Sequence, residues 1–162
     1  MTLKNVQNPL LNHTGLPLFD KIKVEHIKPA VLAVVTEVKT RLRDLETSNP
    51  STWNEIFPPL WECEKLIHNC WSPVSHLHGV LNSSELRDVY QEMQKEIVDL
   101  SLMMGQSQPV FQGLLALREG DLWSSLDSVQ QRIVKKRILS AELDGAKLSA
   151  EERVEFNEIA QE

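Results

Sequence analysis

The clearest pattern in the sequence is a run of apolar residues between positions 53 and 81. They recur at alternating steps of three and four residues: Trp53, Ile56, Leu60, Cys63, Ile67, Cys70, Val74, Leu77 and Leu81. This spacing places all of them on one face of an α-helix. Thr52 and Glu55 form a capping-box pattern just before the run, with Thr52 as the N-cap. The pattern predicts a long amphipathic helix.

Three prolines, Pro58, Pro59 and Pro73, fall inside this predicted helix. A proline in a helix interior removes one backbone hydrogen bond, costs about 3 kcal/mol and kinks the helix. Because the apolar register continues without a break, we expect tertiary packing to outweigh that cost. We therefore predict one kinked helix or two nearly collinear helices, with a kink near Ser72-Pro73.

A second helical face precedes this one. Its apolar positions are Val31, Val34 or Val35, Val38, Leu42 and Leu45. Pro29 fits best in the first turn of this helix, where its missing N–H costs nothing. The helix is predicted to end before Asn49-Pro50.

Two further helices are predicted after position 81. The segment Asn82-Ser83-Ser84-Glu85 begins the first of them, and Gly105 is a natural stop at its C-terminal end. The apolar residues on one face of this helix, its apolar stripe, are Leu86, Tyr90, Met93, Ile97, Leu100 and Met104. A short helix from about Pro109 to Arg118 follows, and a turn is predicted at Glu119-Gly120-Asp121.

The last third of the chain predicts two more helices. Ser124 or Ser125 is the predicted cap of the first, which ends at Asp144-Gly145; Ser149 and Glu152 form a capping box for the second. The predicted inward residues are Val129, Ile133, Ile138 and Leu143 in the first helix, and Val154 and Ile159 in the second. No glycine, basic last turn or proline ends the second helix, which is typical of a fragment of a longer protein or of a frayed natural terminus.

Residues 1–24 show little periodicity and are punctuated by Pro9, Gly15 and Pro17. We predict an extended arm with turns here. Its apolar residues Leu10, Leu11, Leu16, Leu18, Phe19 and Ile22 are expected to pack against the helices. No window shows sustained strand alternation. The predicted fold is an all-α, multi-helix bundle in one domain over residues 1–162, with the arm at 1–24 and helices in 25–162.

Composition and charge narrow the classes of function. The 162 residues carry a formal net charge of -6, which argues against a nucleic-acid binder because phosphate contacts need a positive field. No apolar run approaches the roughly 20 residues of a membrane span. Cys63 and Cys70 are seven apart in a predicted helix, so their Cα atoms lie about 10.5 Å apart, too far for a disulfide. Reduced core cysteines suit a cytoplasmic protein.

Three histidines, His68, His76 and His78, are candidate metal ligands. On a helix, His76 and His78 point about 200° apart, and His68 and His76 are about 80° apart. The sequence holds no His-Glu-x-x-His, the spacing that places two ligands and a base on one helical face. We interpret the three as surface or helix-packing histidines.

An aromatic row and a basic run are the other candidate binding features. Trp53, Phe57 and Trp61 share one helical face; a ligand-stacking platform is one interpretation, and packing in a core or against another domain is the favoured one. The basic residues Arg132, Lys135 and Lys136 share a face that we interpret as solvated rather than phosphate-binding, given the net charge.

The acidic cluster near the end of the chain has a structural explanation. Its members are Glu151, Glu152, Glu155 and Glu158. Acidic residues in the first turns of a helix interact favourably with its dipole. The sequence contains no Gly-x-Ser-x-Gly, phosphate loop or dinucleotide fingerprint. We therefore assign no catalytic, cofactor-binding or metal-binding residue to this chain.

Several strings resemble one protein family. They are Asn8-Pro9-Leu10-Leu11, Gly15-Leu16-Pro17-Leu18-Phe19-Asp20-Lys21-Ile22, Glu25-His26, Thr52-Trp53, Ser72-Pro73-Val74-Ser75-His76-Leu77, Asn82-Ser83-Ser84-Glu85-Leu86-Arg87, Gly120-Asp121 and Glu158-Ile159-Ala160. Together they resemble the N-terminal part of the oligopeptidase A branch of the thimet oligopeptidase family of zinc metallopeptidases. The resemblance covers essentially the whole chain in the right order.

The resemblance implies a mostly helical parent enzyme that is several times longer and hydrolyses short peptides in a deep channel. It implies zinc held by a His-Glu-x-x-His motif and a later glutamate, all in the C-terminal half. None of those residues maps onto this sequence, so the segment is expected to form part of the channel wall and to be inactive alone. The implied location is the cytoplasm, and the implied partners are the catalytic half of the same protein and short peptides.

Two hypotheses follow. The first is an N-terminal structural segment of a zinc oligopeptidase. The second is a stand-alone helical interaction module, whose heptad-like stripes bind a partner helix or dimerise. In both cases uncovered apolar surface should find a partner. We therefore expect self-association of the isolated chain through its last helix or the Trp61 side.

Overall fold

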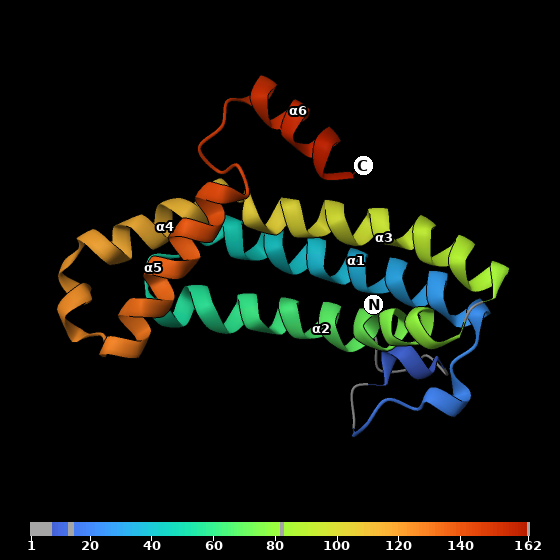
Figure 1. Ribbon diagram of the computed structural model, residues 1–162. Helices are drawn as coiled ribbons and strands as arrows, with labels where there is room; N and C mark the ends of the chain where they lie inside the picture. The colour runs from blue at the N-terminus through green and yellow to red at the C-terminus, as the bar shows by residue number, and fades with distance from the viewer. Residues whose placement is uncertain (1–7, 13–14, 82, 162) are drawn as a thin grey trace. The chain divides into compact units, whose positions relative to one another are not determined.

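The computed structural model describes residues 8–12, 15–81 and 83–161. In chain order its elements are η2 (Pro9–Leu11), η3 (Phe19–Lys21), α1 (Val24–Thr47), α2 (Trp53–Val80), α3 (Ser84–Gly105), α4 (Gln108–Glu119), η4 (Asp121–Ser125), α5 (Ser128–Leu143) and α6 (Ala150–Gln161). No strand occurs in these ranges, and the all-α prediction is confirmed (Figure 1).

The chain forms two compact units. Unit 1 comprises residues 1–39 and 62–98, and unit 2 comprises residues 40–61 and 99–162. The helices α1, α2 and α3 each contribute one part to either unit. The single domain over residues 1–162 stays a prediction.

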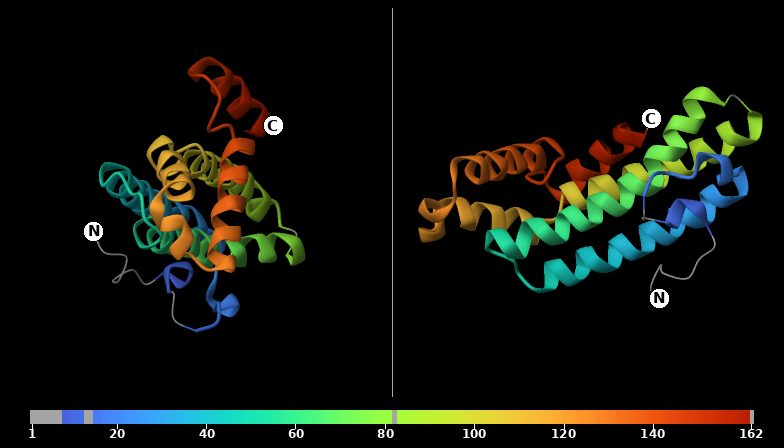
Figure 2. Two further views of the ribbon diagram at one scale, coloured as in Figure 1. Left: turned by 90° about the vertical axis from the view of Figure 1, so that its left-hand side faces the viewer. Right: turned by 90° about the horizontal axis from the view of Figure 1, so that it is seen from below.

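In unit 1, the first part of α1, the last part of α2 and the first part of α3 run alongside one another (Figures 1 and 2). Their buried apolar residues are Ile27, Ala30, Val31, Val34, Val35, Val38, Cys63, Leu66, Cys70, Val74, Leu77, Leu86, Met93 and Ile97. Most belong to the predicted stripes, so the three-and-four spacing identified the core face of each helix.

The start of α1 differs from the prediction. The helix begins at Val24, so Pro29 is its sixth residue and not part of its first turn. Pro29 cannot donate to the carbonyl of Glu25, so one intrahelical bond is missing. Burial of Ile27 and Ala30 on either side of it offsets this loss.

The helix α2 is continuous from Trp53 to Val80, as one of the two predicted arrangements requires. Its capping box is confirmed: the Thr52 N–H donates to Glu55 Oε2 at 3.1 Å, and the Glu55 N–H donates to Thr52 Oγ1 at 3.4 Å. Figure 2 shows α2 changing direction in its last turns, where the kink was predicted. Leu81 lies beyond the helix end and is exposed, so the buried stripe ends at Leu77.

Unit 2 has its own core. Its buried members are Leu42, Leu45, Ile56, Phe57, Leu60, Val110, Phe111, Leu114, Leu117, Val134, Ile138, Ala141 and Ala146. The helix α4 lies within one or two residues of its predicted bounds and packs against α5 and η4. These contacts anchor the otherwise short α4 and α5.

The predicted start of α5 was wrong, and its predicted inner face was confirmed only in part, at Ile138 and Ile133. Its N-cap is Asp127, whose carboxylate accepts from the N–H groups of Val129 and Gln130, whereas Ser124 and Ser125 belong to η4. Asp is as good an N-cap as Ser, and here it lies where the chain leaves the 3₁₀ turn. The buried residues are Val134, Ile138 and Ala141. The predicted inward residues Val129 and Leu143 are exposed, and Ile133 is half-buried.

The helix α6 begins as predicted but presents its apolar residues outward. The Ser149 N–H donates to Glu152 Oε2 at 2.9 Å, and the Glu152 N–H donates to Ser149 Oγ at 3.2 Å, which confirms the capping box. Val154 and Ile159, predicted to face inward, are exposed, and no residue of α6 is buried. A hydrogen bond joins α6 to the rest of unit 2: Oδ1 of the half-buried Asn157 accepts from Gln106 Nε2 at 2.7 Å.

Both cysteines are buried and neither forms a disulfide, as predicted. Burial raises the pKa of the Cys70 thiol to about 12. A thiol with such a pKa stays protonated at neutral pH and is a poor nucleophile. Cys70 is therefore a core residue of unit 1 and not a reactive group.

Three cap glutamates have lowered pKa values. The pKa of Glu55 lies below its ordinary value of 4.5, first because its carboxylate accepts from the Ser51 N–H and then through its hydrogen bonds with Thr52. The N–H and hydroxyl of Ser149 lower the pKa of Glu152 in the same way. The pKa of Glu85 is lowered mainly by its own N–H and by the Ser83 hydroxyl. All three carboxylates are exposed.

A pH dependence of stability follows from Glu55. A carboxyl group whose pKa is lower in the folded state stabilises the fold above its unfolded pKa, and this contribution is lost as pH falls through the folded pKa. We expect the melting temperature of the wild type to fall as pH drops below about 4.5. The Glu55→Gln variant keeps an acceptor but no titrating group, so it should lose less stability over this window. Thermal melts from pH 7 to pH 3 test this, and parallel curves would contradict it.

Candidate functional site

The N-terminal arm of unit 1 is attached to the start of α1. Asn8 caps η2 by accepting from the Leu10 N–H at 3.0 Å, and its Nδ2 donates to the His26 carbonyl at 2.8 Å. Leu10 and Leu11 are buried, as predicted, while Leu16 and Phe19 are exposed. The Asn8-Pro9-Leu10-Leu11 string is therefore an anchor for the arm. The Asn8-Pro9 pair suits the start of η2, because Asn8 caps this 3₁₀ helix and Pro9 fits its first position.

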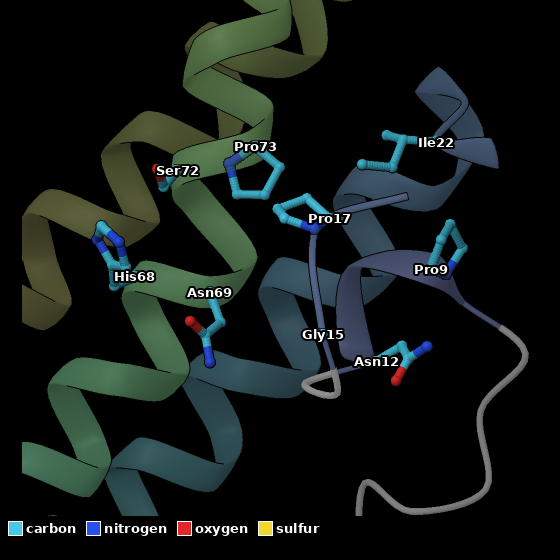
Figure 3. Close-up of a pocket in the computed structure, with 9 residues that line it drawn as sticks. All are labelled: Pro9, Asn12, Gly15, Pro17, Ile22, His68, Asn69, Ser72 and Pro73. Atoms are coloured by element: carbon cyan, nitrogen blue, oxygen red, sulfur yellow. The ribbon is translucent and has the colours of Figure 1, made fainter. Parts of the chain in front are cut away.

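A cavity of about 130 Å³ lies between the arm and α2. It is lined by Pro9, Asn12, Gly15, Pro17 and Ile22 from the arm, and by His68, Asn69, Ser72 and Pro73 from α2 (Figure 3). Figure 3 shows Pro17 beside Pro73. Three of the strings, which begin at Asn8, Gly15 and Ser72, thus meet here, although the third is far from the other two in the sequence. Their shared role is to seat the arm, because the cavity is smaller than the roughly 300–1,000 Å³ of ligand pockets.

The histidines of α2 have separate surroundings. His68 is exposed at the rim of the cavity, and the ring of His76 lies 5.2 Å from that of Phe19. His78 stacks on Tyr90 at 3.9 Å, and Trp71 stacks on the same Tyr90 ring at 4.8 Å. Among residues 8–12, 15–81 and 83–161, no three His, Cys, Asp or Glu side chains are grouped so that they could hold a metal ion. The interpretation of these residues as packing or surface histidines agrees with their contacts.

The aromatic row of α2 lies in unit 2. Trp53 stacks on Phe57 with ring centroids 4.0 Å apart, and Trp61 lies 5.6 Å from Phe57. Phe57 is buried in the unit 2 core and Trp53 packs against that core, which supports the packing interpretation. Trp61 is 43% exposed, so it ends the row at the surface.

The basic run and the acidic cluster are both exposed in unit 2. Arg132, Lys135 and Lys136 line an open groove of about 340 Å³ on α5, together with Ser128, Gln131 and Leu139. Lys135 Nζ lies 5.5 Å from the centre of the Trp123 ring, a cation–π distance. The glutamates of α6 are exposed, and Glu152 forms the helix cap. The basic face is solvated, as interpreted from the sequence.

One polar cluster escaped the sequence interpretation. Gln106 and Ser107 are buried between α3 and α4. Gln106 Nε2 also donates to the Asp144 carbonyl at 2.8 Å, and Ser107 Oγ donates to Glu46 Oε1 at 2.7 Å. Gln108 Nε2 donates to the Ala146 carbonyl at 2.5 Å. Gln106 and Gln108 thus bind backbone carbonyls just after the end of α5, and Ser107 binds a carboxylate near the end of α1. These roles have no sequence signature beyond a short polar link.

The described residues define a class of protein: a helical domain with apolar cores, whose polar side chains cap helices and join segments. The model of the neurolysin/thimet oligopeptidase N-terminal domain matches residues 31–153. The chain therefore belongs to the neurolysin/thimet oligopeptidase family, as the N-terminal domain.

Curated relatives agree with this assignment. The chain is 36% identical over 155 residues to the organellar oligopeptidase A, chloroplastic/mitochondrial, of Arabidopsis thaliana, covering 96% of this chain and 20% of that protein. It is 34% identical to the "Probable cytosolic oligopeptidase A" of the same plant, covering 96% and 22%. It is also 34% identical to the oligopeptidase A of Haemophilus influenzae, covering 96% and 23%. The chain thus spans about a fifth of the length of these relatives.

No helix within the described part of the chain is long and apolar enough to cross a membrane.

Proposed function

We propose that this chain is the N-terminal helical domain of a zinc metallo-oligopeptidase that hydrolyses short peptides. The observation that carries the proposal is the match to the family's N-terminal domain over residues 31–153, with relatives named oligopeptidase A aligned over nearly the whole chain. The proposed role of the domain is to form part of the wall of the substrate channel and to support the catalytic half.

The catalytic residues and the zinc ligands of the proposed parent lie outside this chain. The residues present do not fit the metal, because the sequence holds no His-Glu-x-x-His, and because His76 and His78 contact different aromatic rings. A zinc site with an open position needs three protein ligands converging on one point. We therefore assign no step of hydrolysis to a residue of this chain.

The proposed location is the cytoplasm. Two buried cysteines that form no disulfide and the relative described as cytosolic support it. Disulfides are rare in that compartment, so cysteines outside disulfides suit it. The proposed partners are the catalytic half of the same polypeptide and short peptides.

A chimera tests the proposal. This chain would replace the aligned N-terminal fifth of the Haemophilus influenzae oligopeptidase A. We expect the chimera to hydrolyse short peptides with a kcat near that of the intact relative, because no reacting group is exchanged. Its KM and its preference for peptide length should change, because a channel wall contacts the substrate chain and not the scissile bond.

Two controls make the result decisive. Deletion of the same segment should abolish activity, and circular dichroism should show that the chimera is folded. A folded chimera as inactive as the deletion would contradict the proposal. So would a chimera whose KM and length preference equal those of the intact relative, since a wall residue would then make no difference.

A stand-alone interaction module is the second candidate function. The exposed apolar residues of α5 and α6 favour it, since exposed apolar patches mark interaction sites when they are contiguous. The two candidates are not exclusive, because a domain of a larger enzyme can also bind a partner.

A further inference from the structure

The helix α5 carries a second amphipathic face that points to solvent. Its members follow steps of three, four, three and four: Val129, Arg132, Lys136, Leu139 and Leu143. This spacing forms one continuous stripe, opposite the buried Val134, Ile138 and Ala141. Val129 is 63% exposed, Leu139 55% and Leu143 70%. We call these five residues the α5 face.

Charge makes the α5 face distinct from the rest of the molecule. The helix holds four basic residues and one acidic residue, in a chain whose net charge is -6. The single acidic residue, Glu142, pairs with Lys147 at 2.7 Å. Within the described ranges, Arg132 and Lys136 have no carboxylate partner. The face therefore fits an acidic, amphipathic partner.

A helix of that chemistry is present in the same chain. On α6, an exposed stripe comprises Glu151, Val154, Glu155, Glu158 and Ile159. Val154 is 59% exposed and Ile159 is 65% exposed. We call these residues the α6 face. It combines aliphatic and acidic side chains, whereas the α5 face combines aliphatic and basic ones.

We propose that the α5 face of one copy of this chain binds the α6 face of a second copy. The two faces are both exposed within one copy, so they do not cover each other there. Two such contacts, made reciprocally about a two-fold axis, would double the buried area, as a specific interface requires. The overall negative charge opposes pairing only weakly, because charges beyond about 8 Å are screened at physiological ionic strength.

Charge reversal on each face tests the proposal. The first variant carries Arg132→Glu and Lys136→Glu, and the second carries Glu155→Lys and Glu158→Lys. In each variant the two faces acquire the same sign of charge. We expect the wild type to show a monomer–dimer equilibrium in sedimentation equilibrium, and each variant to dimerise at least about tenfold more weakly.

Sedimentation of an equimolar mixture of the two variants is the decisive experiment. In the mixture an acidic α5 face meets a basic α6 face, and a basic α5 face meets an acidic α6 face. We expect the mixture to recover the affinity of the wild type, which loss of folding in either variant would not allow. A control variant with Lys21→Glu and Lys95→Glu makes the same change in net charge as the α5 variant, but at exposed positions of unit 1, and it should dimerise like the wild type.

Three results would overturn the proposal. The first is a wild-type chain that stays monomeric up to millimolar concentration, which would leave the two faces to another occupant, such as further residues of a longer polypeptide. The second is dimerisation that the reversals on α5 and α6 do not weaken. The third is a mixture of the two variants that remains as weak as either alone.

Discussion

Replacing Phe57 with alanine should lower the free energy of unfolding by about 3–5 kcal/mol. Phe57 is fully buried in the unit 2 core and stacks on Trp53 with ring centroids 4.0 Å apart. The substitution removes its apolar contacts and the aromatic pair, and leaves a cavity among residues such as Leu60 and Leu114 that cannot collapse fully. Urea titration followed by circular dichroism measures the loss.

Phe19→Ala is the matched control. It makes the same chemical change at a residue that is 41% exposed on the arm and contacts the His76 ring. We expect it to cost less than about 1 kcal/mol. If Phe57→Ala were as mild as Phe19→Ala, the assignment of Phe57 to the core would fail.

Replacing Gly113 with alanine should also destabilise the fold, by a smaller amount. A Cβ atom at this position of α4 would lie 2.0 Å from the Pro50 carbonyl oxygen and 3.4 Å from Ile56 Cδ1. Since the closest atom belongs to the backbone, α4 has to shift away from the segment that joins α1 to α2. Overpacking of this kind costs about 1–3 kcal/mol or more, against a gain in helix propensity of at most about 1 kcal/mol. We expect a net loss of about 2 kcal/mol in the same titration.

Gly79→Ala is the matched control, because it changes the helix propensity without adding a close contact. Gly79 also lies in a helix, but no atom comes within 4 Å of a Cβ built there. This variant should be neutral or slightly more stable than the wild type, because alanine is the better helix former. Equal stability changes in Gly79→Ala and Gly113→Ala would contradict the close approach of α4 to Pro50.

Local signals in the sequence predicted the fold well where they were dense. The apolar stripe of α2 has so many members that its period identified the buried face despite three prolines. The capping boxes at Thr52 and Ser149 involve residues only three apart, so neither needs tertiary information. The N-cap of α5 was missed because Ser124 and Ser125 have the right chemistry, and only the 3₁₀ turn of η4 places Asp127 at the helix start.

The same reasoning was less successful at predicting the buried faces of α5 and α6. In α5 and α6, the aliphatic residues were predicted to face inward because apolar side chains usually do. Leu143 and Ile159 are exposed instead, because contacts with the rest of unit 2 decide which face is covered. Angles along a helix already separated His76 from His78, and in the structure the two contact different aromatic rings. The buried role of Gln106 depends on where α5 ends, which no local pattern reveals.

We propose that this chain is a helical scaffold and that the catalytic groups of the parent enzyme lie outside residues 1–162. The most direct test is a peptidase assay of the purified, folded chain with short fluorogenic peptides, with and without added zinc, alongside the intact Haemophilus influenzae oligopeptidase A. The account predicts turnover by the intact relative and none by this chain under either condition. Peptide hydrolysis by this chain that a chelator abolishes and zinc restores would contradict it.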